Sequence, residues 1–400
     1  MAAAEQHRHA VARAAASVSA PSVHAQALAG ALALGLLGTG CATRAAAVRA
    51  PDLTATPVVV TPRAEDDLPL APRFERAREM LGEGKSADAA RVFDGIVADP
   101  SAGELAPPSL FNAGLGWEAS GDRERALLRF AEARGRFGAT EAGRNASLRE
   151  ARLLAWLERW PELGEAADRG LARGDSADAE RVEWLGAKAL ALVEAGDADA
   201  AQRPIDRAQS LIEALGLGQG GKLPVAVAEV ELALGEVRRL RGERITFAPM
   251  PPNFADALER RCQSLLDAQS AYTDAMRSYD AHWAAMSGYR VGQMYQSLHR
   301  DVLAITPPAS ADTDEKRALF LGAMQLRYRV LLEKGLSMME HTVALGERTG
   351  EASAWIDRAR EALAGLTRSL AETRAALAKL PHGEAQLQQA LDDLAAKAKK

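Results

Sequence analysis

The sequence is poor in the residues that mark several common protein classes. Only two of its 400 residues are cysteines, Cys41 and Cys262, and aromatic residues make up 5%. Two cysteines are too few for a disulfide framework, and no run of about 20 apolar residues could form a membrane-spanning helix. The net charge of -5 means that the protein has no excess of basic residues to attract a phosphate backbone, so we expect no nucleic-acid partner.

Motifs that carry chemistry are also scarce. No two of the seven histidines stand in a His-x3-His pair with a helix-borne carboxylate, so we predict no metal site. The segment Gly216–Lys222 matches a nucleotide phosphate loop as far as its lysine, but Leu223 follows where Ser or Thr would bind magnesium. Such a loop also follows a strand, whereas a helix is expected before Gly216. We therefore expect no nucleotide, no cofactor and no enzymatic activity.

Helix-forming residues are abundant. Hydrophobic residues make up 48% of the chain, which is enough for a buried core, and Ala, Leu, Arg and Glu dominate the composition. These residues favour helices, whereas the β-branched and aromatic residues typical of strands are few. The composition predicts an all-α protein.

Residues 1–40 are typical of an export signal. Arg8 and Arg13 supply positive charge, a short apolar stretch spans residues 25–38, and small residues precede Cys41. This order is the pattern of a signal peptide. The alternative is an ordinary alanine-rich N-terminal helix followed by a chance cysteine.

The segment around Cys41 resembles the lipoprotein box of bacteria. Thr39 and Gly40 precede the cysteine as in that family, although Gly38 stands where Leu, Val or Ile is usual. The resemblance implies that Cys41 is acylated, which would make the membrane a partner through the N-terminal lipid. Ala42 in the next position favours, by resemblance, the outer membrane, with the body facing the periplasm. Residues 41–72 contain five prolines and few large apolar residues, and they predict a disordered tether.

A repeat of about 37 residues follows the tether. Residues of similar size recur at spacings of 37, 37 and 38, with small residues in two columns and mostly large residues in the other two. A helical hairpin cannot bury its apolar face alone, so stacked neighbours would supply the core. The columns are Ala77, Gly114, Ala151 and Ala189; Met80, Trp117, Leu154 and Leu192; Ala89, Ala126, Leu163 and Ala201; and Phe93, Phe130, Ala167 and Ile205.

The segment Leu110–Trp117, followed by Gly121, Asp122 and Ala126, resembles the tetratricopeptide repeat family. The resemblance implies a superhelix of helical hairpins over residues 73–245, with a concave groove that binds peptides or protein surfaces. The hairpin that contains Leu163 is degenerate, because alanine is usual at that position.

The second half of the chain is expected to be helical but different. Residues 224–242 predict one more helix whose partner is missing, because the proline-rich segment 248–252 follows. A single proline-free helix is then predicted from Asn253 to Ile305, with Gly288 and Gly292 marking a bend or a close helix contact. Residues 253–400 are predicted to form a C-terminal bundle of long helices.

All five tyrosines of the chain lie in these long helices. Two interpretations stay open: the rings pack between helices, or some of them form an aromatic partner surface. The candidate partner-binding residues are Tyr272, Tyr279, Trp283, Tyr289 and Tyr295. The segment 288–301 also resembles repeat lipoproteins of bacterial envelope and gliding-motility machines.

Taken together, these features predict a lipid-anchored scaffold that assembles or tethers other envelope proteins, motility-machine proteins among them. A module that binds peptidoglycan or another glycan is one alternative. A cytoplasmic repeat adaptor is the other, if the leader is not a signal peptide.

Overall fold

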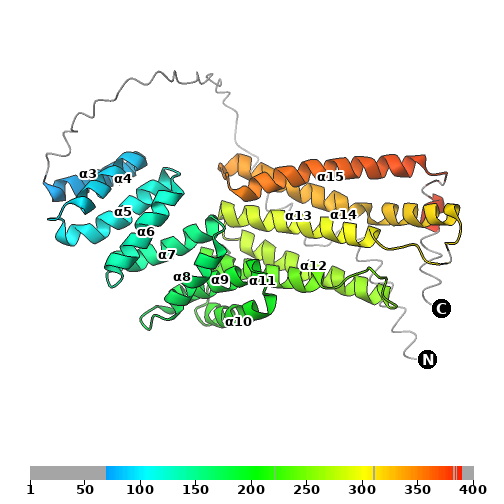
Figure 1. The fold of residues 1–400 in the computed structure, drawn as a ribbon, viewed down its shortest axis with the longest axis horizontal. Coiled ribbons are helices and arrows are strands. Elements are labelled where there is room, and N and C mark those ends of the chain that lie inside the picture. The colour runs from blue at the N-terminus through cyan, green and yellow to red at the C-terminus, as the bar shows by residue number, and fades with distance from the viewer. Residues whose placement is uncertain (1–68, 220, 310, 382, 384, 390–400) are drawn as a thin grey trace, which may run out of the picture. The chain divides into compact units, whose positions relative to one another are not determined.

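The computed structural model describes residues 69–389 except 220, 310, 382 and 384, and no strand occurs among them (Figure 1). The predicted signal peptide, Cys41 and the tether as far as residue 68 lie outside the described residues. The first helix among the described residues, α3, begins at Leu70 and thus inside the predicted tether. Pro72 lies in its first turn, where a missing N–H costs no helical hydrogen bond.

Four helical hairpins form the first part of this all-α fold. The second helix of each hairpin packs against the first helix of the next, so that the hairpins form one continuous stack. The hairpins are α3 (Leu70–Gly82) with α4 (Ser86–Ala98), α5 (Ala106–Ala119) with α6 (Arg123–Phe137), α7 (Glu141–Trp156) with α8 (Trp160–Leu171), and α9 (Asp178–Glu194) with α10 (Ala198–Ala214). A short 3₁₀ turn, η1 (Gly103–Leu105), precedes α5.

The turn inside each hairpin requires a left-handed residue. Gly84, Gly121 and Gly196 fill this position with φ angles of 77°, 89° and 84°. In the third hairpin the same position is Glu158, with a φ of 57°. A residue with a Cβ atom is strained in this region by about 1–2 kcal/mol, so Glu158 marks an exception in the stack.

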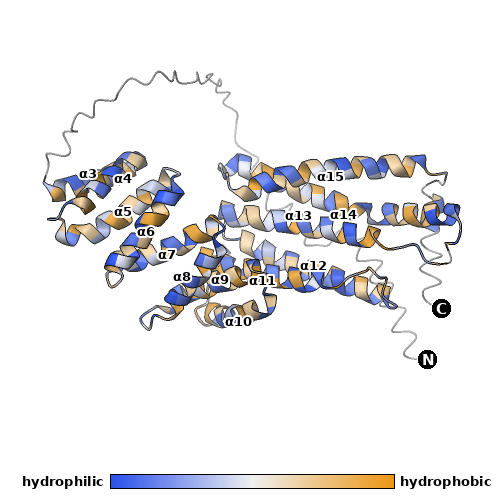
Figure 2. Ribbon diagram, viewed as in Figure 1, coloured by the Kyte–Doolittle hydropathy of each residue, from blue (hydrophilic) through white to orange (hydrophobic). Residues whose placement is uncertain are grey.

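The residues of the repeat columns lie in the interior of the stack. Those named above are buried, apart from Leu192, which is half-buried against the core. Close packing explains the small residues: a Cβ atom added to Gly114 would lie 2.5 Å from Cε1 of Phe130. Figure 2 shows polar and apolar residues alternating along these helices, as expected of helices buried on one face.

The helix α11 (Val225–Glu243) has a partner, contrary to the prediction. It packs along its length against α12 (Phe254–Met276), beyond the connection of residues 244–253. A Cβ atom on Gly235 would lie 2.8 Å from Cε1 of Tyr272, which repeats the relation of Gly114 to Phe130. The two helices therefore form a fifth hairpin whose connection is longer than the others.

The helix predicted from Asn253 to Ile305 is in fact two helices. The first, α12, ends at Met276, and α13 (Ala281–Leu303) begins after a four-residue turn. Tyr279 adopts a φ of 57° in this turn, and the carboxylate of Asp280 accepts a hydrogen bond from the backbone N–H of Trp283 at 3.1 Å. This N-cap starts a new helix although the turn contains no glycine or proline.

Long helices complete the fold. The helices α14 (Asp314–Thr349) and α15 (Ala354–Lys379) follow α13, and α14 packs extensively against both. The glycines of α13 mark a close contact with α14, since a Cβ atom on Gly292 would lie 2.7 Å from Cε of Met339. None of the described helices has the length and apolar character needed to span a membrane.

The core has one large part and two small parts. The large cluster runs from α4 and α5 through the hairpins into α13, α14 and the start of α15. Most buried residues of the first hairpin lie in a small cluster that they share with the segment 102–113. The helices α14 and α15 share another small cluster around Leu332, Met339 and Leu366.

Candidate functional site at the junction of the hairpins and the long helices

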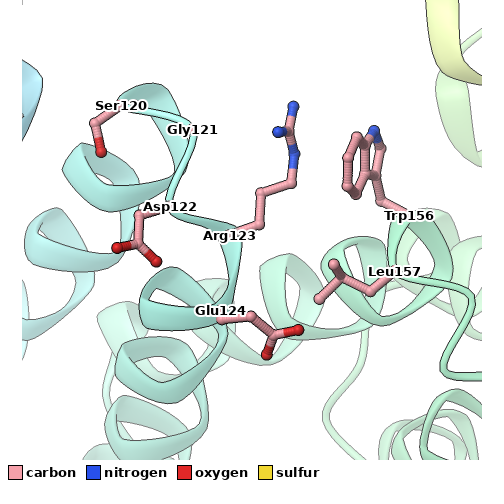
Figure 3. Close-up of a pocket in the computed structure, with 7 residues that line it drawn as sticks. All are labelled: Ser120, Gly121, Asp122, Arg123, Glu124, Trp156 and Leu157. Atoms are coloured by element: carbon pink, nitrogen blue, oxygen red, sulfur yellow. The ribbon is translucent and has the colours of Figure 1, made fainter. Parts of the chain in front are cut away.

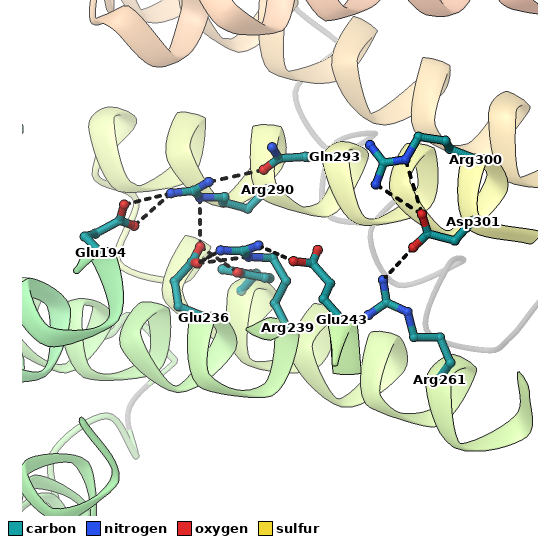
Figure 4. Close-up of polar contacts among 10 residues, drawn as sticks. Glu194, Glu236, Arg239, Glu243, Arg261, Arg290, Gln293, Arg300 and Asp301 are labelled. Atoms are coloured by element: carbon teal, nitrogen blue, oxygen red, sulfur yellow. Dashed lines mark hydrogen bonds and ion pairs between the residues drawn. The ribbon is translucent and has the colours of Figure 1, made fainter. Parts of the chain in front are cut away.

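A buried ion network joins the hairpin stack to the long helices (Figure 4). Arg290 of α13 lies at its centre: its Nη2 is 2.8 Å from Oε1 of Glu194, and its Nε is 2.8 Å from Oε1 of Glu236. Glu194 ends α9 and Glu236 lies in α11. One guanidinium therefore holds three helices from different parts of the chain.

Glu236 is ionised although it is fully buried. Burial by itself would raise its pKa, but Arg290 and Arg239 outweigh this effect and lower it below the usual value. Nη2 of Arg239 lies 2.6 Å from Oε2 of Glu236, and the hydroxyl of Tyr272 donates to Oε1 at 2.7 Å. Burial raises the pKa of Tyr272 well above its ordinary value, so the phenol remains a neutral donor.

Glu194 is held less firmly than Glu236. Burial raises its pKa, and Arg290 opposes this effect without overcoming it. In the described part of the chain, the cation that lies within ion-pair distance of Glu194 is Arg290. The charge of Glu194 therefore depends on Arg290.

A second contact joins the third hairpin to the long helices. Oε2 of Glu158, in the left-handed turn, lies 2.8 Å from Nη2 of Arg358 in α15. The ring of Trp156, two residues earlier, lies 5.6 Å from the ring of His282 at the start of α13. The hairpin whose sequence departs from the repeat pattern is thus the one whose turn meets the C-terminal helices.

His282 is a buried polar group in this contact. His282 is 5% exposed, and neither nitrogen of its ring has a hydrogen-bond partner among the described residues. Its Nδ1 lies 3.5 Å from Oε1 of Glu351, which is long for a hydrogen bond. The nearby His282 is the largest influence that lowers the pKa of Glu351, and burial opposes it. Glu351 is therefore an ionised carboxylate beside the ring.

An open cavity of about 570 Å³ lies beside this contact (Figure 3). It is lined by the turn residues Ser120–Glu124 of the second hairpin and by Trp156 and Leu157 of the third. The guanidinium carbon of Arg123 lies 3.7 Å from the centre of the Trp156 ring, a cation–π contact across two hairpins. We call this cavity the Arg123 pocket.

Three of the five candidate partner-binding residues are not available to a partner. Tyr272 is fully buried, Trp283 is 4% exposed and Tyr295 is 7% exposed. The hydroxyl of Tyr295 donates to Oε1 of Gln269 at 2.7 Å, and burial raises its pKa to about 12. The prediction of a partner surface is therefore wrong for these three residues, which pack between helices.

The two other candidates differ from each other. Tyr289 is half-buried and its ring lies 5.7 Å from that of Trp355 in α15. Tyr279 is 77% exposed in the strained turn between α12 and α13. The five residues do not form one continuous surface.

The structure also describes the surroundings of Cys262 and of the glycine-rich segment that begins at Gly216. Cys262 is a half-buried free thiol whose pKa is raised by burial. The described residues contain no group of three or more His, Cys, Asp or Glu that could hold a metal ion. In the segment that resembles a phosphate loop, a helix rather than a strand precedes Gly216, and Leu223 binds the end of α12 through a backbone hydrogen bond to Arg277.

Sequence reasoning missed the junction. Glu158 and Arg358 lie 200 residues apart in the chain, and no short motif connects them with Trp156 or His282. One signal was present: Glu158 replaces the turn glycine of the other hairpins.

Comparison with known proteins adds little to this description. No protein-family model and no curated protein sequence matches the chain. Among solved structures, it is similar to a tetratricopeptide repeat protein from Parabacteroides merdae, with 12% sequence identity and a TM-score of 0.41. That similarity covers 74% of this chain and 98% of the other. The hairpin architecture described above rests on the contacts within this chain.

Proposed function

We propose that the protein is a lipid-anchored scaffold of the bacterial cell envelope that binds other envelope proteins. The observation that carries this proposal is the stack of five hairpins fixed to three long helices through the buried Arg290 network. Such a stack presents a long, rigid surface, and rigid surfaces bind partners without a large ordering cost.

The anchor rests on the sequence around Cys41. The leader and the small residues before the cysteine support acylation, and residues 42–68 would separate the body from the lipid surface. Because Ala42 follows the cysteine, we favour an anchor in the outer membrane, with the body of the protein in the periplasm.

Replacing Cys41 by Ser tests the anchor. We expect the variant to move from the membrane fraction to the soluble fraction, because the acyl chains supply the membrane affinity. The matched control is Cys262→Ser, which changes the other cysteine and should leave the protein in the membrane fraction. An unchanged membrane fraction of Cys41→Ser would contradict the anchor, whereas a leader that is not cleaved would favour the cytoplasmic adaptor.

Cross-linked co-purification tests the scaffold. The tagged full chain would be recovered from solubilised envelopes and its partners identified by mass spectrometry, with an unrelated tagged lipoprotein as the control. We expect specific envelope proteins to be enriched. Recovery of no protein above the control would refute the scaffold function.

The glycan-binding alternative depended on exposed Tyr and Trp rings that could stack on sugars. Tyr272, Trp283 and Tyr295 are buried and are not available to stack on a sugar, which leaves Tyr279 as the largely exposed ring among the five candidates. Sedimentation with purified peptidoglycan at moderate salt would detect such binding, and we expect the protein to remain in the supernatant.

A further inference from the structure

The Arg123 pocket contains a cation that forms no ion pair with any described residue. The guanidinium of Arg123 has no ion pair and no hydrogen bond within the described part of the chain; its close contact is the Trp156 ring at 3.7 Å. The two carboxylates of the lining each have another partner. Asp122 lies 3.1 Å from Arg125, and Glu124 lies 3.6 Å from Arg159.

The side chains in the pocket point in directions that favour an incoming anion. Figure 3 shows Arg123 and Trp156 projecting into the same open space, whereas Asp122 and Glu124 point away from them. A guanidinium that lies on an aromatic ring keeps the N–H groups at its edge free to donate. These donors form a planar fork that matches the two oxygens of a carboxylate.

The surroundings of Arg123 add to this preference. Arg123 is the first residue of α6, and the N-terminal end of a helix carries a partial positive charge. Glu351 interacts with Arg123 electrostatically, but it forms no ion pair with it and lies 3.5 Å from His282 instead. The stack of Arg123 on Trp156 holds the guanidinium in place before a ligand arrives, which reduces the entropy lost on binding.

We propose that the Arg123 pocket binds carboxylate groups of an acidic segment in a partner protein. A cavity of about 570 Å³ admits one or two side chains but no folded domain, so the ligand is an extended or terminal segment. This assignment rests on the proposed scaffold function and specifies the chemistry of one of its contacts.

The test uses the detergent-solubilised full chain and a fluorescein-labelled hexaglutamate peptide, with a hexaglutamine peptide as the uncharged probe. Binding is measured by fluorescence anisotropy. We expect Arg123→Gln to weaken hexaglutamate binding by roughly tenfold or more, the usual loss when a hydrogen bond between two charged groups is removed. Arg123→Lys should bind with intermediate affinity, because it keeps the charge but loses the planar fork.

Arg136→Gln is the matched control. Arg136 lies near the end of the same helix, is exposed and pairs with Glu132 at 2.6 Å, so its replacement makes the same change in net charge outside the pocket. We expect its affinity to remain within about twofold of the unaltered protein, as for most surface charges. Circular dichroism would verify that all variants remain helical.

Equal hexaglutamate binding by Arg123→Gln and the unaltered protein would overturn the proposal. So would equal binding of hexaglutamine, or no binding of hexaglutamate at about 1 mM, the weak end of measurable affinities. The co-purification experiment separates this result from failure of the scaffold. Partners recovered without any peptide binding would refute the pocket alone, whereas peptide binding without partners would refute the scaffold function.

Discussion

Replacing Arg290 by Met would test how strongly the hairpin stack is fixed to the long helices. Methionine keeps most of the apolar length of the side chain and removes the positive charge. The side chains involved are almost inaccessible: Arg290 is 12% exposed, Glu194 is 11% exposed and Glu236 is fully buried. The substitution therefore leaves charge in the interior rather than at the surface.

The expected loss follows from what remains after the substitution. Removing one partner of a buried ion pair destabilises proteins by about 3–5 kcal/mol. Glu236 keeps Arg239 and the hydroxyl of Tyr272, whereas Glu194 loses its cation. We therefore expect a loss near the lower end of this range, about 3 kcal/mol at pH 8.

The loss should depend on pH. Burial already raises the pKa of Glu194, and Arg290 is the main influence that opposes this effect. Without Arg290 the pKa in the folded state rises further above the value in the unfolded state. At low pH such a carboxyl group is neutral and does not destabilise the folded protein. As the pH rises through its folded-state pKa, the group ionises in the interior and the free energy of unfolding falls. We expect a smaller loss at pH 5 than at pH 8.

Urea unfolding at both pH values would measure the free energy of unfolding, and hydrogen exchange would locate the change. We expect faster exchange in the C-terminal end of α9 and in α13, with α3 and α4 unaffected, because contacts in a repeat stack are made between neighbours. Arg348→Met, which removes an exposed arginine of α14, is the control. A loss no larger than that of Arg348→Met, or an equal loss at both pH values, would refute this reasoning.

The remaining predictions concern strained or buried groups. Glu158→Gly should raise the free energy of unfolding by about 1 kcal/mol, because relief of the left-handed strain exceeds the value of a partly exposed ion pair with Arg358; Glu158→Ala should lower it, and a gain for the alanine variant would contradict this account. Tyr279→Gly should raise it by about 1 kcal/mol in thermal unfolding, since the ring is 77% exposed and φ is 57°, whereas Tyr279→Ala should give no gain. Burial, followed by the charge of Asp274, raises the pKa of Glu231 to about 7. Glu231→Gln should therefore stabilise the protein by about 3 kcal/mol at pH 8 and by little near pH 4.5; urea unfolding that shows the same gain at both pH values would contradict the assignment.

The regular part of the fold was predictable from the sequence because its signals are local. Gly84, Gly121 and Gly196 lie in the turns of three hairpins, where all three adopt the left-handed conformation that glycine tolerates. The all-α class follows from composition and from helical spacing, which do not depend on distant residues.

Two features of the fold were not predictable because their causes are not local. The partner of α11 was missed because the connection of residues 244–253 delays it beyond the repeat spacing, although the ring of Tyr272 takes the place that Phe130 has in the second hairpin. The break after α12 was missed because Arg277–Asp280 contains neither glycine nor proline. A capping aspartate and a strained tyrosine form that turn.

The junction was the least predictable part. Four of the five tyrosines and Trp283 were correctly placed on helices, whereas Tyr279 lies in the turn after α12. Helical spacing does not say which side another helix will cover. Tyr272 is buried because Gly235 and Glu236 of the preceding helix, α11, lie against it. The Arg123 pocket arises where turns of two hairpins meet, and neither turn contains a motif that indicates it.

The small core of the first hairpin has a mechanical consequence. If the chain is pulled between residue 69 and the long helices, the load passes through the hairpins in sequence. The first hairpin packs mainly in the small cluster that it shares with the segment 102–113, and Ala90 is its one buried residue in the large cluster. The later hairpins lie in the large cluster, which the Arg290 network reinforces. The first hairpin would therefore detach before the others, and the protein would lengthen under tension while the surface near the long helices kept its shape.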